Sequence, residues 1–140
     1  MRSVSVMFLT SLLALGGCGG SATAPSSTPG PGGTTAPAAV ATRIAIYTGD
    51  GQRGPKGSVL AAPLCTNVFD QNGRLMIGVI VNYTVATGGG QVQAPTSVPT
   101  DASGIATSGL WMLGPAAGTQ TVTASTAGVV ASVTFTATAY

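Results

Sequence analysis

From residue 41 onward, apolar and polar side chains alternate along the chain with a period of two. The last segment shows this most clearly, because Val129, Ala131, Val133, Phe135 and Ala137 alternate with residues that are mostly Ser and Thr. Such alternation is typical of β-strands that bury one face and leave the other in water. It predicts strands at residues 43–47, 64–69, 79–86, 91–93, 105–113, 120–125 and 129–138.

No window of the chain carries a sustained apolar stripe at helical spacing, and Gly or Pro interrupts every long segment. The chain is therefore predicted to be all-β. The apolar faces of the strands also predict the residues that fill the core. These are Ile44, Ile46, Leu64, Val68, Val79, Val81, Tyr83, Val85, Trp111, Leu113, Val122, Ala124, Val133 and Phe135.

One predicted strand, with the sequence GIATSGLWMLG, departs from regular alternation. Ala106 and Ser108 cannot continue in phase to Trp111 and Leu113 without one extra residue, which predicts a β-bulge at Ser108 and Gly109. The bulge would turn Trp111, the single tryptophan, into the core. The functional alternative is an exposed Trp111 that stacks on a sugar ring.

The N-terminal segment has the composition of an export signal. Arg2 is the only charged residue before Cys18, and residues 4–15 are apolar apart from Ser and Thr. This run is shorter than the roughly 20 apolar residues that a membrane-spanning helix requires. The sequence LGGC, which ends at Cys18, resembles the lipobox of bacterial lipoproteins. The resemblance implies that residues 1–17 are removed and that Cys18 becomes a lipidated N-terminus; the alternative is an ordinary signal peptide with an incidental cysteine.

The next segment has a different composition. Residues 19–39 contain four prolines and no aliphatic side chain larger than alanine. Such a segment cannot bury enough apolar surface to offset the entropy of ordering, so residues 18–39 are predicted to form a lipidated Cys and a disordered linker. Residues 40–140 are then expected to form one folded domain.

The C-terminal part contains the segments PLCTNVFDQNGRLMIGVIVNYTVATGGGQV, TDASGIATSGLWMLGPAAGTQTVTASTAG and VTFTATA. They resemble the bacterial immunoglobulin-like domain of group 1 (Big-1), a module repeated in intimin- and invasin-type adhesins and found in many lipoproteins. The resemblance covers about residues 41–140. It implies an immunoglobulin-like antiparallel β-sandwich of about seven strands. Such modules usually occur in tandem, whereas this chain carries one copy.

The charged residues offer little catalytic chemistry. The chain contains no His, and its only acidic residues are Asp50, Asp70 and Asp101, each at the start of a turn that ends in Gly. These carboxylates are predicted to accept hydrogen bonds from the amides that follow them. A calcium site at Asp70 and Asn72 is the alternative, although no Glu exists to supply a bidentate ligand.

Because no acid pair and no nucleophile–base couple can be formed, we expect no enzyme activity and no cofactor. Only 6% of the residues are charged, so no electrostatic attraction to nucleic acid is expected. Cys65 is a second cysteine in a chain whose first is expected to carry lipid. It is predicted to be a small, shielded side chain, and an interchain disulfide is the alternative.

Two functional hypotheses follow. The first is a non-catalytic module of the cell envelope, anchored in the membrane through Cys18, with a structural or adhesive role. It would bind a protein or a cell-surface polymer through loops and sheet edges. The alternative is a lipoprotein that binds a small ligand or a carbohydrate. Both predict an exported protein at the outer membrane or the cell surface.

Overall fold

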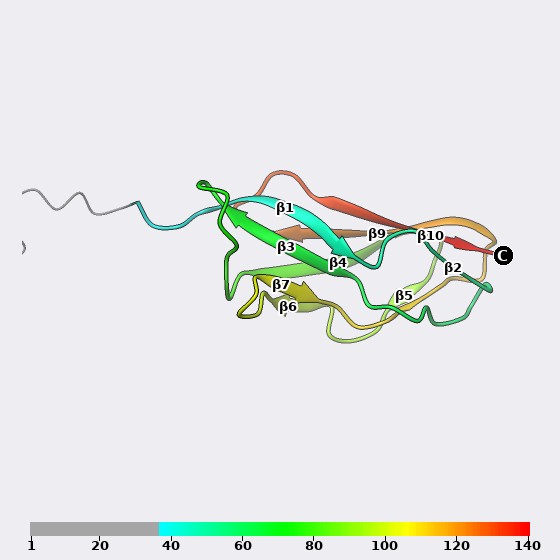
Figure 1. The fold of residues 1–140 in the computed structure, drawn as a ribbon. Coiled ribbons are helices and arrows are strands. Elements are labelled where there is room, and N and C mark those ends of the chain that lie inside the picture. Colours follow the sequence, from blue (N-terminus) through cyan, green and yellow to red (C-terminus); the bar gives the residue numbers. More distant parts are fainter. Residues whose placement is uncertain (1–36) are drawn as a thin grey trace, which may run out of the picture. The chain divides into compact units, whose positions relative to one another are not determined.

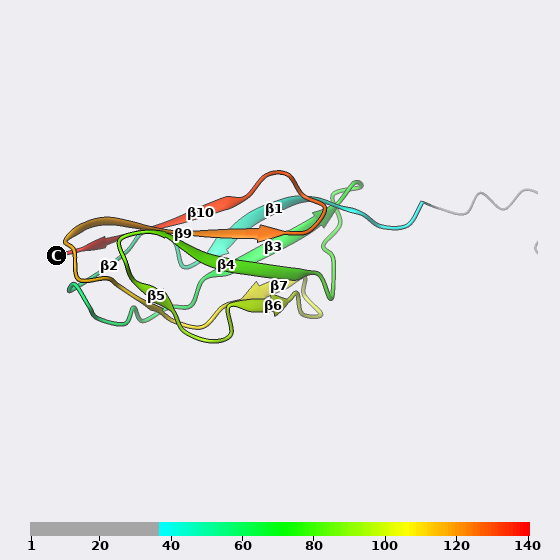
Figure 2. The ribbon, with the colours of Figure 1, turned by 180° about the vertical axis from the view of Figure 1, so that it is seen from behind.

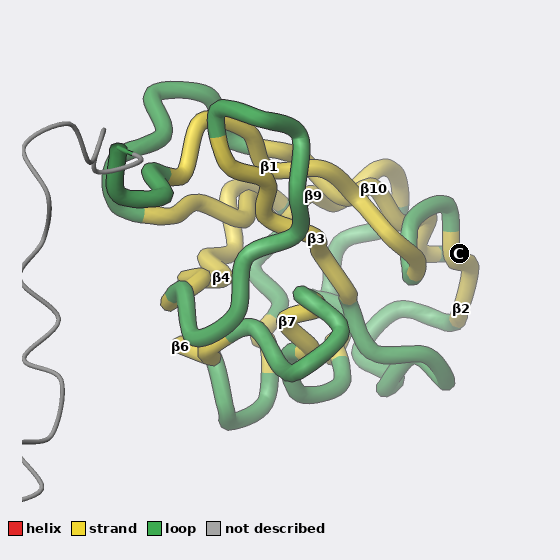
Figure 3. The backbone as a smooth tube through the Cα atoms, turned by 60° about the vertical axis from the view of Figure 1, so that its left-hand side comes forward, coloured by secondary structure: helices red, strands yellow, loops and turns green. Residues whose placement is uncertain are grey.

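The structure is a computed structural model that describes residues 37–140 of the chain. Two β-sheets pack face to face in this region (Figure 1), and strands and loops account for all of it (Figure 3). The strands are β1 (Ala41–Thr48), β2 (Gln52–Gly54), β3 (Cys65–Asp70), β4 (Ile80–Thr87), β5 (Gln91–Val92), β6 (Ser97–Pro99), β7 (Ile105–Thr107), β8 (Trp111–Met112), β9 (Gly118–Thr126) and β10 (Val133–Ala139).

The larger sheet has the strand order β2-β10-β9-β4-β6 and faces the viewer in Figure 2. The smaller sheet has the order β1-β3-β7, and β5 pairs with β8 in a separate ribbon. This arrangement confirms the predicted all-β, immunoglobulin-like sandwich. One pair differs from the antiparallel expectation, because β2 runs parallel to β10.

The parallel pair arises because the first part of the chain contributes to both sheets. β1 pairs with β3 in the smaller sheet, and the chain then crosses to the larger sheet and continues as β2. Gly49 makes this crossing possible. Its φ is 98°, and a Cβ atom there would lie 2.3 Å from the carbonyl oxygen of Pro63. Only glycine accommodates both this backbone conformation and this close approach.

The predicted single strand at residues 105–113 is wrong, and so is its β-bulge. The structure contains two short strands, β7 beside β3 and β8 beside β5. Between them the Ser108 N–H donates to the Leu64 carbonyl, whereas the Gly109 N–H donates to the Pro95 carbonyl. The chain changes partners at this point, so no extra residue is absorbed within one ladder.

Two further differences concern the short strands β2 and β6 and the first residue of β10. β2 and β6 were not predicted, because strands of three residues are too short to show alternation. β10 begins at Val133, so the predicted strand at residues 129–138 starts four residues too early. Ala131 is consequently exposed, since it lies in the connection between β9 and β10.

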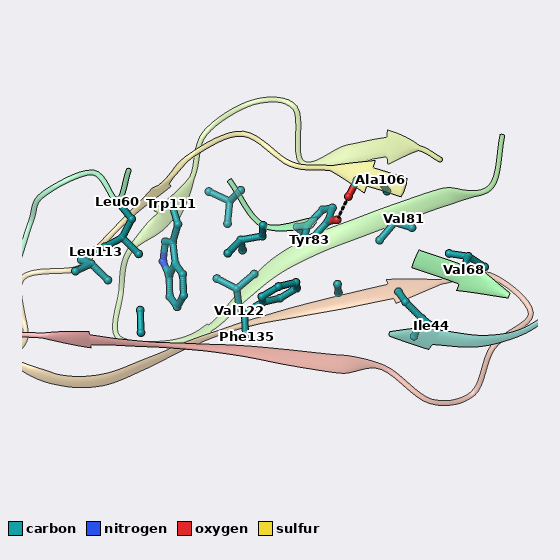
Figure 4. Packing of buried hydrophobic residues seen from close by; sticks show 14 of the residues in the cluster. Ile44, Leu60, Val68, Val81, Tyr83, Ala106, Trp111, Leu113, Val122 and Phe135 are labelled. Carbon is teal, nitrogen blue, oxygen red and sulfur yellow. Dashed lines mark hydrogen bonds between the residues drawn. The ribbon is translucent and has the colours of Figure 1, made fainter. Parts of the chain in front are cut away.

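The predicted core is confirmed in its main part. Ten of the predicted residues are buried: Ile44, Leu64, Val68, Val81, Tyr83, Trp111, Leu113, Val122, Ala124 and Phe135. The other four, Ile46, Val79, Val85 and Val133, are partly buried and pack against them. Several of the buried side chains are seen in Figure 4 between the strands of the two sheets. Leu60, which lies outside the predicted strands, also belongs to the core, as do Val92 and Ala106 within them.

A buried tyrosine links the two sheets. The Tyr83 hydroxyl of β4 donates a hydrogen bond to the Ala106 carbonyl of β7 at 2.7 Å, as Figure 4 shows. Its oxygen lies 2.9 Å from the Thr66 hydroxyl of β3. Because the single tyrosine proton goes to Ala106, Thr66 must be the donor in the second bond. Burial raises the pKa of Tyr83 to about 12, so the hydroxyl stays neutral.

Phe135 lies at the centre of the core and is fully buried. We expect Phe135→Ala to reduce the free energy of unfolding by about 3 to 5 kcal/mol, because it removes a buried ring and leaves a cavity. Thr134→Ala, at the exposed neighbouring position of the same strand, is the matched control and should have little effect. Urea unfolding of the two variants measures the difference. Equal stability of both would mean that the burial of the β10 faces is assigned wrongly.

Tyr83→Phe tests the link between the sheets. The substitution keeps the ring but leaves the Ala106 carbonyl and the Thr66 hydroxyl without their partner, so we expect a loss of about 1 to 3 kcal/mol. In the wild-type protein, the raised tyrosine pKa adds stability below pH 10 that is lost as the pH rises toward 12. Tyr83→Phe should therefore lose less stability than the wild type over that interval. A variant as stable as the wild type at neutral pH would contradict the linking role.

Candidate functional surfaces

Two of the predicted carboxylate turns are confirmed. The Asp70 carboxylate accepts the N–H groups of Asn72 at 2.7 Å and of Arg74 at 2.8 Å. The Asp101 carboxylate accepts the N–H groups of Ser103 and Ile105 in the same way. The Arg74 amide, followed by the Asn72 amide, holds the pKa of Asp70 below its ordinary value. These carboxylates stabilise the local turns.

Asp50 has a different role from the one predicted. Its carboxylate accepts the backbone N–H of Thr136 at 2.7 Å and the Thr136 hydroxyl at 2.9 Å. The Gly51 N–H also donates to the Thr136 carbonyl. Asp50 therefore fixes the crossing between β1 and β2 to the middle of β10. The Thr136 amide is the main cause of the lowered pKa of this carboxyl.

Among residues 37–140, no three His, Cys, Asp or Glu side chains gather in a group that could hold a metal ion. The candidate ligands Asp70 and Asn72 are adjacent in a turn, and the Asp70 oxygen faces backbone amides. Both amides donate to Oδ1, so this oxygen is engaged in closing the turn. The geometry therefore favours the turn interpretation over the calcium alternative.

Cys65 lies at the start of β3 and is 7% exposed. Its sulfur lies 3.5 Å from the Thr107 hydroxyl of the neighbouring strand β7. The side chain thus fills a small space between two strands, as the sequence predicted. An interchain disulfide would require this end of the smaller sheet to open.

Trp111 is fully buried, which overturns the alternative of a sugar-stacking tryptophan. It lies beside Leu60 and Leu113 in the core (Figure 4). The part of the surface formed by residues 37–140 contains no pocket. A small-molecule site normally requires a concave, largely apolar cleft.

The outer face of the larger sheet carries hydroxyl groups on neighbouring strands. The threonines of β9 and β10 stand opposite one another in three registered pairs, from Thr119 with Thr138 to Thr123 with Thr134. Thr84 of β4 extends the array on the other side of Thr123. We call this surface the hydroxyl face; it consists of Thr84, Thr119, Thr121, Thr123, Ser125, Thr134, Thr136 and Thr138. It can form many hydrogen bonds to a partner. Charged groups lie at its edge, because the Asp50 carboxylate accepts the Thr136 hydroxyl and Arg53 of β2 is registered with Thr138.

The chain enters the sandwich at one end and reaches Tyr140 at the other (Figure 1). The entry end is formed by the start of β1, which pairs with the end of β3, and by the connection from β9 to β10. At the opposite end, the Tyr140 N–H donates to the Gly54 carbonyl, and the Lys56 N–H donates to the Tyr140 carbonyl. The basic residues Arg53 and Lys56 are exposed there and face no acidic cluster that could serve as a catalytic pair.

The predicted lipidation site, Cys18, lies outside the described residues, as do the predicted signal peptide and most of the predicted linker. Residues 37–140 contain no helix that is long and apolar enough to cross a membrane.

Comparison with solved structures supports the fold. The chain is similar to the D00-D0 domain of intimin, with a TM-score of 0.51 and 18% identity over 73% of this chain and 48% of that one. It is also similar to domains 4 and 5 of the S-layer protein SbsC, with a TM-score of 0.52 and 21% identity over 72% of this chain and 53% of that one. This chain spans only about half the length of these structures. No protein-family model and no curated protein matches it.

The hydrogen bonds from backbone amides to the Asp50 and Asp70 carboxylates should make the stability of the domain depend on pH in the acid range. The pKa values of Asp50 and Asp70 are lowered in the folded state. Both carboxylates therefore add to the free energy of unfolding at pH values above the pKa of an unfolded aspartate, near 3.9. This stabilisation is lost as the pH falls through their pKa values in the folded state. The free energy of unfolding should therefore be constant above about pH 5 and decrease below about pH 4. Urea unfolding across this range should show a smaller decrease in the double variant Asp50→Asn/Asp70→Asn. An unchanged acid dependence in that variant would assign the effect to other groups.

Proposed function

We propose that this chain is a non-catalytic, immunoglobulin-like module of the cell envelope, held at the membrane by a lipid on Cys18. The observation that carries the proposal is the combination of a lipobox-like sequence with a sandwich that has neither a pocket nor an acid–base pair within residues 37–140. In this assignment residues 1–17 are the signal peptide, residues 18–39 the linker and residues 40–140 a Big-1-like domain. The protein would act at the outer membrane or the cell surface.

The arrangement of the domain supports a structural or adhesive role. The chain enters at one end of the sandwich, so an anchored domain can present its opposite end and its long faces to the surroundings (Figure 1). The hydroxyl face offers neutral hydrogen-bonding groups to a protein or a surface polymer. Modules of the same fold in intimin and in an S-layer protein belong to adhesin and surface-layer proteins. The alternative of a small-ligand or carbohydrate binder has less support, because Trp111 is buried and the described surface has no pocket.

The lipid anchor makes a specific prediction. In the wild-type protein, we expect mass spectrometry to find a diacylglycerol on Cys18 and cleavage after Gly17. Two or three acyl chains would hold the protein in the membrane fraction, whereas a single chain gives only reversible binding. Cys18→Ser should abolish both the added mass and the membrane recovery, because it removes the thiol that is acylated. Cys65→Ser is the matched control and should keep both.

The opposite result would separate an ordinary signal peptide from a lipoprotein signal. If the Cys18→Ser protein were still cleaved after Gly17 and still recovered with the membrane, the cysteine would be incidental. The proposed anchor would then be wrong.

A further inference from the structure

The connection between β3 and β4 exposes apolar side chains as it crosses from one sheet to the other. The Met76 N–H donates to the Val68 carbonyl in the smaller sheet, and the Gly78 N–H donates to the Thr100 carbonyl beside the larger one. Met76 packs against the core between these two points. Its neighbours Leu75 and Ile77 are 47% and 67% exposed. The inner side of this crossing covers the core, and its outer side is aliphatic.

Three more exposed aliphatic residues lie at the same end of the sandwich. Val40 directly precedes the first pair of β1 and β3, and Ile80 is the first residue of β4. Val130 lies in the connection from β9 to β10 and is fully exposed. These five residues form the linker-end cluster: Val40, Leu75, Ile77, Ile80 and Val130. The other exposed large hydrophobic residues of the described region are Tyr47, Val59 and Tyr140.

This distribution differs from what solvent alone would favour. Connections at the surface of a soluble domain are normally polar, and gathered exposed apolar residues mark contact with a protein or a membrane. The outer positions of β9 and β10 from Thr119 to Thr123 and from Thr134 to Thr138, in contrast, are occupied by hydroxyl groups. The charged residues close to the cluster are Arg43, Arg74, Asp70 and Asp101, and their charges balance. We therefore expect the partner that covers this end of the domain to be apolar, because the nearby charges give no net electrostatic attraction.

We propose that the linker-end cluster docks on the lipid bilayer to which the chain is anchored. The occupant is indicated by the position at which the chain enters, because the segment that leads back to Cys18 joins the domain at this end. The inference rests on the proposed lipid anchor. The aliphatic side chains enter the boundary between headgroups and acyl chains, and the sandwich stands on the membrane by its entry end.

The anchor makes such a small contact sufficient. About 20 residues separate Cys18 from the domain, and a chain of that length spans at most about 70 Å. A tether of this reach keeps the domain at an effective concentration in about the millimolar range at the membrane surface. A few aliphatic side chains, too weak to bind a free protein to lipid, then suffice to hold an anchored one.

The test places a fluorescent label at each end of the same anchored protein. The lipidated Ile77→Cys variant is labelled at position 77 with an environment-sensitive dye and reconstituted in phosphatidylcholine vesicles. Val59→Cys, which is similarly exposed but lies near the opposite end, carries the same dye as the matched control. The wild-type protein reports background labelling of the buried Cys65. Quenching is measured with iodide in the water and with spin-labelled lipids in the bilayer.

We expect the Ile77 label to be quenched by the spin-labelled lipids and protected from iodide, and the Val59 label to show the reverse. Replacing Ile80 and Val130 by Ser should return the Ile77 label toward the Val59 values. Because the nearby charges balance, neither high salt nor anionic lipid should change the result. An Ile77 label as accessible to iodide as the Val59 label would overturn the proposal. Protection from both quenchers that grows with protein density would also overturn it, since a second copy would then cover the cluster.

A second form of the protein separates this inference from the lipid anchor itself. A chain that begins at residue 19 is attached to nickel-chelating lipid through an N-terminal histidine tag. If Cys18 proves not to be acylated but the tagged protein still places the Ile77 label in the bilayer, the anchor is wrong and the docking surface stands. If Cys18 is acylated and the label stays in water in both forms, the anchor stands and the docking surface is wrong.

Discussion

The hydrogen bonds of the buried Tyr83 hydroxyl are the constraint on which the packing of the two sheets depends. Hydrophobic burial drives the sheets together but has no preferred direction, so it tolerates small shifts of one sheet across the other. A hydroxyl removed from water tolerates no such shift, because it must keep its partners. Thr66 and Ala106 supply them from two strands of the smaller sheet. The core around Phe135 and Trp111 is therefore packed in one arrangement.

The three aspartates and the buried Gln120 of the described domain hold the fold through their hydrogen bonds. All three carboxylates accept hydrogen bonds from backbone amides, and the buried Gln120 side chain bonds to the backbone of Gly114 and Ala116. In each aspartate the Oδ1 atom accepts two hydrogen bonds, so this oxygen is less available as a general base or a metal ligand. The few acidic residues of the described domain thus stabilise its fold.

The surfaces differ according to the elements that form them. Along β9 and β10, every second side chain points outward, and these positions carry hydroxyl groups that water can solvate. At the entry end the outer positions belong to connections, and there they are aliphatic at Leu75, Ile77 and Val130. The long faces of the domain are thus compatible with water on their own. The entry end is the part of the described surface that a covering partner would stabilise.

The strands whose two faces differ could be predicted from the amino-acid sequence. Alternation between apolar and hydroxyl residues places Val122 and Phe135 inside and Thr123 and Thr134 outside, since strand geometry sends successive side chains to opposite faces. The Asp-to-Gly turns at Asp70 and Asp101 could also be predicted, because their hydrogen bonds span only a few residues.

Which strands pair with one another could not be predicted from the sequence, because it depends on contacts between distant residues. Asp50 resembles the other turn aspartates in sequence, yet it binds Thr136, far along the chain. The change of partner at Gly109 and the parallel pairing of β2 with β10 likewise depend on residues distant in sequence. The exposure of Ile77 could not be predicted either. Its segment connects the two sheets, and the alternating pattern does not show how the sheets lie relative to each other. Local backbone geometry sets the direction of a side chain, whereas the register and choice of partner come from the packing of the whole domain.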